Sequence, residues 1–217
     1  MGKKVIIFLT VIILAAFAAT ASWLFYKHLT KDDEQKRLYN QAIEAANNKD
    51  FETAVKLLRG LDYEDSKEKL SEIIKFMDVI DLPQSFSLFS KEDSPEKINE
   101  KYGSNGTNTL FKTDEQFRKI YENKGLLYCY KGNIEFIFTK GKLDNIYWTL
   151  DNASPEAYKE IKDYLAENFG SEGNEKELSF SDASTGSIVS WGNERITFTR
   201  KDREGSTCSL GLKKEYY

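Results

Sequence analysis

The chain has 217 residues and a formal net charge of −4. Its first 28 residues contain three lysines and no acidic residue, which leaves 28 basic and 35 acidic residues in the rest of the chain. This excess of acidic residues argues against nucleic-acid binding, because counterion release requires clustered lysine and arginine. Two cysteines and one histidine, His28, are too few for a zinc or haem centre and for a histidine-based catalytic site. We therefore expect a non-enzymatic protein with no catalytic residues, no cofactor and no bound metal.

An uncharged apolar segment occupies residues 5–26. As a helix it would extend about 33 Å, which is enough to cross the hydrocarbon core of a membrane. Lysines precede the segment, and the aromatic residues at its far end suit the membrane interface. We predict that residues 1–28 form an uncleaved transmembrane anchor. The alternative is a cleaved signal peptide, for which Ala-Thr-Ala at 19–21 would be the cleavage site.

The orientation of this anchor is less well determined by charge. The N-terminal tail has two lysines, whereas four basic residues fall in the first dozen residues after the span, and this count mildly opposes a cytoplasmic N-terminus. A long C-terminal part can, however, be translocated largely regardless of charge. We predict a single-pass protein of the cell membrane with its C-terminal part outside the cytoplasm.

Residues 29–82 have the apolar spacing of helices, and we predict three helices at about 33–46, 51–60 and 65–79. The segment YNQAIEAANNKDFETAVKLL resembles a tetratricopeptide repeat, and the resemblance extends over residues 33–79. Its helix-packing residues would be Tyr39, Ala42, Ala45, Phe51, Ala54 and Leu58.

The turn of this repeat departs from the family, because Lys49 stands where the family has glycine. The continuation LDYEDSKEKL is similar to a segment common in repeat-bearing membrane proteins of Gram-positive bacteria. The family resemblance implies binding of a partner protein. The alternative is a short helical stalk that acts as a spacer, because repeat arrays generally need about three repeats for stability.

A ten-residue pattern occurs twice in the C-terminal half. KGNIEFIFTK at 131–140 and WGNERITFTR at 191–200 share a Gly-Asn pair and a Phe-Thr pair at an offset of sixty residues. Ser-Pro-Glu at 94–96 recurs at 154–156 with the same offset. Because two separate motifs keep one offset, we predict an internal duplication.

The two repeats, at about 94–150 and 154–212, should each form a helix followed by a three-stranded antiparallel meander. Ser-Pro-Glu is typical of a helix N-terminus, because serine caps the helix, proline fits its first turn and glutamate faces the positive end of the dipole. The helices should end at Gly103 and Gly170.

Hairpin turns between the strands are expected at 131–133 and 140–142 in the first repeat, and at 192–193 and 202–205 in the second. A single helix with a single meander would bury little apolar surface. We therefore predict that residues 83–217 form one α+β domain, in which the two units share a sheet and both helices cover the same face.

Tandem repeats of this kind resemble the beta-lactamase-inhibitor-protein-like family, which includes small envelope-assembly lipoproteins. The resemblance covers about residues 84–217 and lies in the passage from Ser-Pro-Glu to Tyr-Gly or Phe-Gly, followed by aromatic strands with FTKGKLDNIYW. It implies protein binding by the open face of the sheet, with no catalytic residues to carry over. The chain departs from the family in having an apolar anchor instead of a lipidated cysteine.

Aromatic residues are dense in the predicted strands, and those on the uncovered face would be accessible to a partner. We nominate Tyr128, Tyr130 and Tyr147 as candidate partner-binding residues. Cys129 and Cys208 also lie in predicted strands. Outside the cell they could form a disulfide, and the alternative is that both are small, buried apolar side chains.

The sequence thus predicts a membrane-anchored, extracytoplasmic protein–protein interaction module of the bacterial cell envelope. It would bind an unidentified protein partner, attach to the membrane through residues 5–26 and not bind nucleic acid. The alternative is an envelope sensor or regulator that binds a peptide or a cell-wall fragment.

Overall fold

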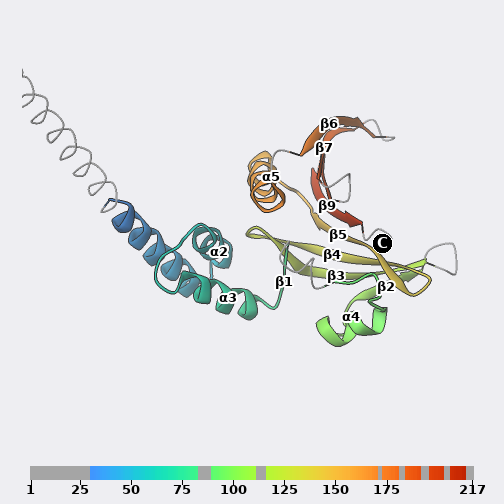
Figure 1. Cartoon of the computed structure of the whole chain (residues 1–217), viewed down its shortest axis with the longest axis horizontal. Helices are drawn as coiled ribbons and strands as arrows, with labels where there is room; N and C mark the ends of the chain where they lie inside the picture. Colours follow the sequence, from blue (N-terminus) through green and yellow to red (C-terminus); the bar gives the residue numbers. More distant parts are fainter. Residues whose placement is uncertain are drawn as a thin grey trace, which may run out of the picture. The chain divides into compact units, whose positions relative to one another are not determined.

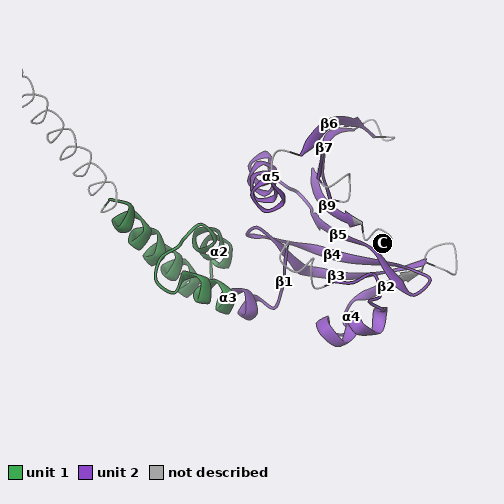
Figure 2. Ribbon diagram, viewed as in Figure 1, with its two compact units in different colours: residues 1–73 green, residues 74–217 purple. Residues whose placement is uncertain are grey.

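The computed structural model describes residues 30–82, 89–110, 116–170, 173–180, 184–191, 196–202 and 206–213. The chain divides into two compact units, residues 1–73 and residues 74–217 (Figure 2). Within the described ranges, no helix is both long enough and apolar enough to cross a membrane. The predicted anchor at 5–26 lies outside these ranges.

The described part of the first unit contains three helices: residues 30–47, α2 (Phe51–Arg59) and α3 (Ser66–Met77). The last of these continues into the second unit. Each lies within three residues of a predicted helix at both ends. The Asp50 carboxylate caps α2 by accepting a hydrogen bond of 3.2 Å from the backbone N–H of Thr53. Alanine and leucine side chains form the interior of this unit, among them Ala42, Ala54 and Leu58, which are fully buried.

Lys49 adopts a backbone φ of 63° in the turn before α2. This left-handed conformation is the one that glycine adopts most readily. The position where the sequence departs from the tetratricopeptide pattern therefore has the backbone geometry that suits glycine.

A hydrogen bond also links the first and third helices of this unit. The Tyr39 hydroxyl donates to the carboxylate of Asp65, just before α3, and this bond, together with burial, raises the pKa of Tyr39 to about 12.

The second unit is a mixed α+β structure built on one sheet (Figure 1). Along the chain its elements are β1 (Ile80–Leu82), α4 (Pro95–Tyr102), β2 (Thr107–Leu110), β3 (Gln116–Leu127), β4 (Tyr130–Thr139), β5 (Lys142–Leu150), α5 (Pro155–Phe169), β6 (Asn174–Ser179), β7 (Thr185–Trp191), β8 (Ile196–Asp202) and β9 (Thr207–Lys213). The strand order is β1-β3-β4-β5-β9-β8-β7-β6, and β2 also pairs with β3. The end of the predicted stalk, Ile80–Leu82, is therefore a strand of this sheet.

Both helices of the second unit begin and end where the sequence predicts. The hydroxyls of Ser94 and Ser154 cap them by accepting hydrogen bonds from backbone N–H groups three residues on. Gly103 and Gly170 follow their last turns with φ values of 85° and 76°. A side chain other than glycine would be strained in this conformation.

Among the described residues, α4 and α5 are each followed by four strands, where three were predicted. The additional strands are β2 and β6. β2 pairs with β3 outside the main strand order, and β6 is the last strand of that order. β6 is largely exposed and has the polar sequence Asn-Glu-Lys-Glu-Leu-Ser. An exposed edge strand of this kind buries neither of its faces. Its sequence therefore needs no alternation of apolar residues, and for this reason the strand was not predicted.

The first hairpin turn also differs from the prediction at 131–133. Leu127 pairs with Tyr130, so Tyr128 and Cys129 form the turn, and Tyr128 has a φ of 58°. Gly132 instead lies within β4, where a Cβ atom would come 2.7 Å from the indole nitrogen of Trp148. This glycine serves close packing and not a turn.

The second predicted turn is confirmed. Thr139 pairs with Lys142, and the two residues between them, Lys140 and Gly141, have φ values of 53° and 76°. Positive φ at both positions is typical of the two-residue type I′ hairpin. The turns expected in the second repeat at 192–193 and 202–205 lie outside the described residues, except for Asp202, which is the last residue of β8.

The two sets of strands join where β5 pairs with β9, and both helices lie on the same face. Phe136, Ile146, Leu212 and Ile196 are successive cross-strand partners, so their side chains share one face of the sheet. On that face α4 contacts Phe136 through Tyr102, and α5 stacks Tyr158 on Phe198 with ring centroids 5.1 Å apart. One hydrophobic core therefore runs beneath both helices.

Candidate functional site

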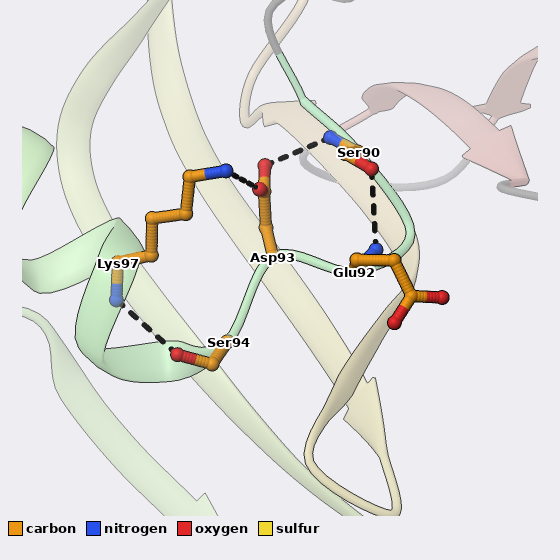
Figure 3. Close-up of polar contacts among 5 residues, drawn as sticks. All are labelled: Ser90, Glu92, Asp93, Ser94 and Lys97. Carbon is orange, nitrogen blue, oxygen red and sulfur yellow. Dashed lines mark hydrogen bonds and ion pairs between the residues drawn. The ribbon is translucent and has the colours of Figure 1, made fainter.

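A buried carboxylate fixes α4 to the sheet. Asp93 is 2% exposed, accepts a 2.8 Å hydrogen bond from the backbone N–H of Ser90 and forms an ion pair with Lys97 (Figure 3). Its own carbonyl accepts from the backbone N–H of Leu143, the second residue of β5. Burial disfavours the ionised carboxyl, but the bonds from Lys97 and Ser90 outweigh it and lower the pKa of Asp93. This network is structural, and it orients the helix that covers one face.

The opposite face of the sheet is covered by neither α4 nor α5. Cross-strand pairing places one row of residues on it: Ile120, Glu135, Tyr147, Gly211, Thr197 and Ser190. Tyr147 is 37% exposed, whereas its neighbours along β5, Ile146 and Trp148, are each 1% exposed and point into the core. We refer to this surface, which carries Tyr147, as the open face.

The open face changes character across the β5–β9 junction. On the β3–β5 side it carries Ile120, Ile137 and Tyr147, and the Arg118 guanidinium lies 3.4 Å from a Glu135 carboxylate oxygen. On the other side the row that crosses β5, β9 and β8 carries hydroxyls, from Thr149, Ser209 and Thr199, and it continues to Ile188 of β7 and Lys176 of β6. The surface combines apolar and aromatic side chains with polar ones, which is the usual make-up of a protein interface.

Of the three nominated tyrosines, the structure places only Tyr147 on the open face. Tyr130 occupies the same face of β4 as the buried residues Ile134 and Phe136, and its hydroxyl donates to the Glu160 carboxylate of α5 at 2.9 Å. Tyr128, in the turn, packs on Tyr164 of α5 with ring centroids 5.3 Å apart. Two of the nominated residues therefore lie on the helix side of the sheet.

A cavity of about 150 Å³ lies beside these two tyrosines on the helix side. Tyr128 and Tyr164 form part of its wall, and three carboxylates from α5, those of Glu160, Asp163 and Glu167, complete it. These α5 residues recur at the three- and four-residue spacing that places side chains on one face of a helix. The cavity has a negative lining and is small for a ligand site.

Cys129 and Cys208 are both buried, and no disulfide joins them. Cys129 lies in the β3–β4 turn, whereas Cys208 lies in β9 opposite Leu150. Burial raises the pKa of the Cys208 thiol to about 11, so it is a poor nucleophile at neutral pH. The structure favours the alternative in which both cysteines are small, buried side chains.

No cluster of histidine, cysteine and acidic side chains suited to a metal ion occurs in the described part of the chain. The two buried charged side chains there, Asp93 and Lys119, both bond to residues of α4, Lys97 and Asn99. The other members of the open face, above all Ile120 and Ile137, were missed by the sequence analysis. Alternation in the strands could have suggested them, but it does not say which face the helices cover.

Comparison with known proteins gives no relative. No family model, no curated protein and no solved structure matches this chain.

Proposed function

We propose that the chain is a membrane-anchored, extracytoplasmic protein–protein interaction module of the bacterial cell envelope, without catalytic activity. The observation that carries this proposal is the open face, a broad sheet surface with an exposed tyrosine at its centre and both helices on its other side. The apolar segment at 5–26 supports the anchor, and the tetratricopeptide-like stalk would hold the sheet domain away from the membrane.

The size of the open face suits a protein partner. Seven neighbouring strands form this face, in the order β3, β4, β5, β9, β8, β7 and β6. With a spacing of about 4.8 Å and a length of about seven residues each, they cover roughly 650 Å². A standard interface buries about 800 Å² on each partner. The cavity beside Tyr164 is about 150 Å³, below the roughly 300–1,000 Å³ of a typical small-molecule site. These magnitudes favour a protein partner on the open face over a peptide or cell-wall fragment in the cavity beside Tyr164.

An internal duplication accounts for this architecture. Each half is a helix followed by an antiparallel meander, and the last strands of the two halves, β5 and β9, pair with each other. Thr149 and Ser209, which are sixty residues apart in the sequence, are direct partners at this junction. In this proposal the two halves arose from one unit whose helix and strands could not close a core alone.

Site-specific photo-crosslinking in intact cells tests the proposal. A photoreactive residue at Tyr147 or Thr199 should capture one and the same protein, because both side chains lie on the open face. The same residue at Tyr130 or at the exposed Lys159 of α5 is the matched control and should not capture it. Capture from Tyr130 or Lys159 alone would contradict the proposal.

Protease accessibility tests the orientation in the membrane. Protease added to whole cells, with the outer layers opened where necessary, should digest the sheet domain. Complete protection until the cell membrane is broken would place the domain inside the cytoplasm and contradict the extracytoplasmic assignment.

A further inference from the structure

The outer edge of β3 has a gap between its two neighbouring strands. β2 pairs with its first half, Phe117–Ile120, and β1 pairs with its end, Gly125–Leu127. Between these segments the β3–β4 register shifts, and Asn123 has a φ of 52°. Such bulges often lie beside functional sites, because they redirect side chains.

A cavity of about 110 Å³ opens at this gap. It is lined by residues from the start of β1, the end of α4 and the bulge of β3, among them Ile80, Lys101, Tyr102, Tyr121 and Lys124. All belong to the second unit. Two ammonium groups, two phenol rings and one carboxylate, that of Asp78, therefore line one small cavity.

The positive charge at this cavity exceeds the negative charge. Lys124 is neutralised by an ion pair with the Asp78 carboxylate, and its ammonium also donates to the Asp78 carbonyl at 3.1 Å. The Lys101 ammonium lies 5.3 Å from the ring centroids of both Phe89 and Tyr102, and it forms no salt bridge within the described residues. Asp93 attracts Lys101 only at longer range, since its carboxylate is already bound by Lys97.

A third lysine lies behind the cavity wall. Lys119 is 2% exposed, and its ammonium lies 5.4 Å from the ring centroid of Tyr121. It donates to the Asn99 side-chain oxygen, and burial lowers its pKa because no carboxylate compensates its charge. An anion in the neighbouring cavity would stabilise this buried cation.

The phenols add hydrogen-bonding capacity. Burial raises the pKa of Tyr102 to about 12, so its hydroxyl keeps its proton and can donate to an anion. The Tyr121 hydroxyl donates to the Gly103 carbonyl at 3.0 Å, which satisfies an otherwise open group at the C-terminus of α4. This bond partly screens an anion in the cavity from the negative C-terminal end of the α4 dipole.

We propose that this cavity binds a carboxylate group carried on a short, small side chain or chain end, with Lys101 as the main ion-pair partner and Tyr102 as a donor. Its volume corresponds to roughly four waters at about 30 Å³ each, so it takes the end of a molecule and not a whole drug-sized ligand. The apolar wall at Ile80 would contact the carbon next to the carboxylate. The C-terminus of a peptide and a free short-chain acid share this chemistry.

Two-dimensional NMR of the 15N-labelled full-length chain tests the site. N-acetylalanine is the probe for a peptide C-terminus, and butyrate is the probe for a free short-chain acid. N-acetylalaninamide, which has no carboxylate, is the uncharged control for N-acetylalanine. We expect saturable shifts of the Lys101, Tyr121 and Lys124 amides with one or both carboxylates, and none with the amide. The stronger of the two carboxylates identifies the source. Equal shifts with sulfate or with the amide would overturn the proposal.

Substitutions complete the test. Lys101→Gln should weaken carboxylate binding at least tenfold, and Tyr102→Phe should weaken it by a smaller factor because the ring is kept. Lys159→Gln, on the exposed surface of α5, is the control and should bind as the unmodified chain does. Since Lys101 is also exposed, its loss should not unfold the protein, which the melting temperature checks. Unchanged binding in Lys101→Gln would overturn the proposal.

Discussion

Tyr147 and Gly211 are direct partners across the β5–β9 junction, and the tyrosine ring occupies the space that a side chain at position 211 would fill. A Cβ atom at Gly211 would lie 3.0 Å from Cε1 of Tyr147 and 2.9 Å from Oγ1 of Thr197. Both contacts are to side-chain atoms that can rotate away. The absence of a side chain at Gly211 therefore leaves room for the Tyr147 ring on the open face.

Gly211→Ala should displace the Tyr147 ring while changing the free energy of unfolding by no more than about 1 kcal/mol, because only side chains must move. Gly186→Ala is the contrast, since its Cβ would lie 2.0 Å from the backbone carbonyl oxygen of Arg200. That variant should lose about 1–3 kcal/mol. Urea denaturation compares the two, and an equal loss in both would contradict this reading of Gly211.

Asp93→Asn should destabilise the protein by about 1–3 kcal/mol, because it removes the charge that Lys97 and the Ser90 N–H bind in a buried position. The pKa of Asp93 is lowered in the folded state, so its contribution is complete above the unfolded value of about 3.9 and is lost as the pH falls through the folded value. The difference between the two proteins should therefore shrink at low pH.

Glu92→Gln is the control for this experiment. Glu92 forms an exposed ion pair with Lys142, and exposed pairs of this kind contribute little. Chemical denaturation over a pH series should show no measurable change in this variant. A pH-independent difference for Asp93→Asn would contradict the assigned role of the carboxylate.

Lys119→Met should leave the protein at least as stable as before at neutral pH. The methionine fills a similar volume and removes a buried cation, whose only hydrogen-bond acceptor in the described part of the chain is Asn99. Because the pKa of Lys119 is lowered in the folded state, its charge costs stability at neutral pH. This cost disappears as the pH rises from the folded value towards about 10.4.

Urea denaturation at neutral pH and near pH 10 measures this effect. The stability advantage of Lys119→Met, where one is seen at neutral pH, should decrease at the higher pH. A loss at neutral pH of more than about 1 kcal/mol would show instead that the bond to Asn99 outweighs the burial of the charge.

The two cysteines should remain reduced and react slowly in the folded protein. Both side chains are buried, and burial raises the pKa of Cys208 to about 11. A thiol reagent should label them fully only in denaturant, and treatment with reductant should not change the mass of the purified chain. A mass increase on reduction would indicate a disulfide.

Local signals in the sequence were sufficient for the helices and for one hairpin. Ser94 and Ser154 precede prolines, and Gly103 and Gly170 follow the last turns, so these boundaries depend on neighbours in the chain alone. Lys140-Gly141 likewise forms a turn by its own backbone preferences. These predictions were confirmed because no distant residue decides them.

The errors have the opposite cause. Gly132 was expected in a turn, but it lies in β4 because the Trp148 side chain, distant in sequence, needs the space. Tyr130 and Tyr147 both alternate with other residues in strands, and only the position of α5 decides which of them is covered. Face assignment depends on tertiary packing, and alternation alone does not supply it.

The most direct test of whether the open face binds the partner is to place a positive charge on this face. Thr149→Arg puts a cation between the neutral partners Asn133 and Ser209, close to Tyr147, whereas Asn168→Arg adds the same charge to the exposed end of α5. In cells, with a photoreactive residue at position 199, we expect Thr149→Arg to abolish capture of the partner and Asn168→Arg to leave it intact, with unchanged melting temperatures. Undiminished capture in Thr149→Arg would contradict the account.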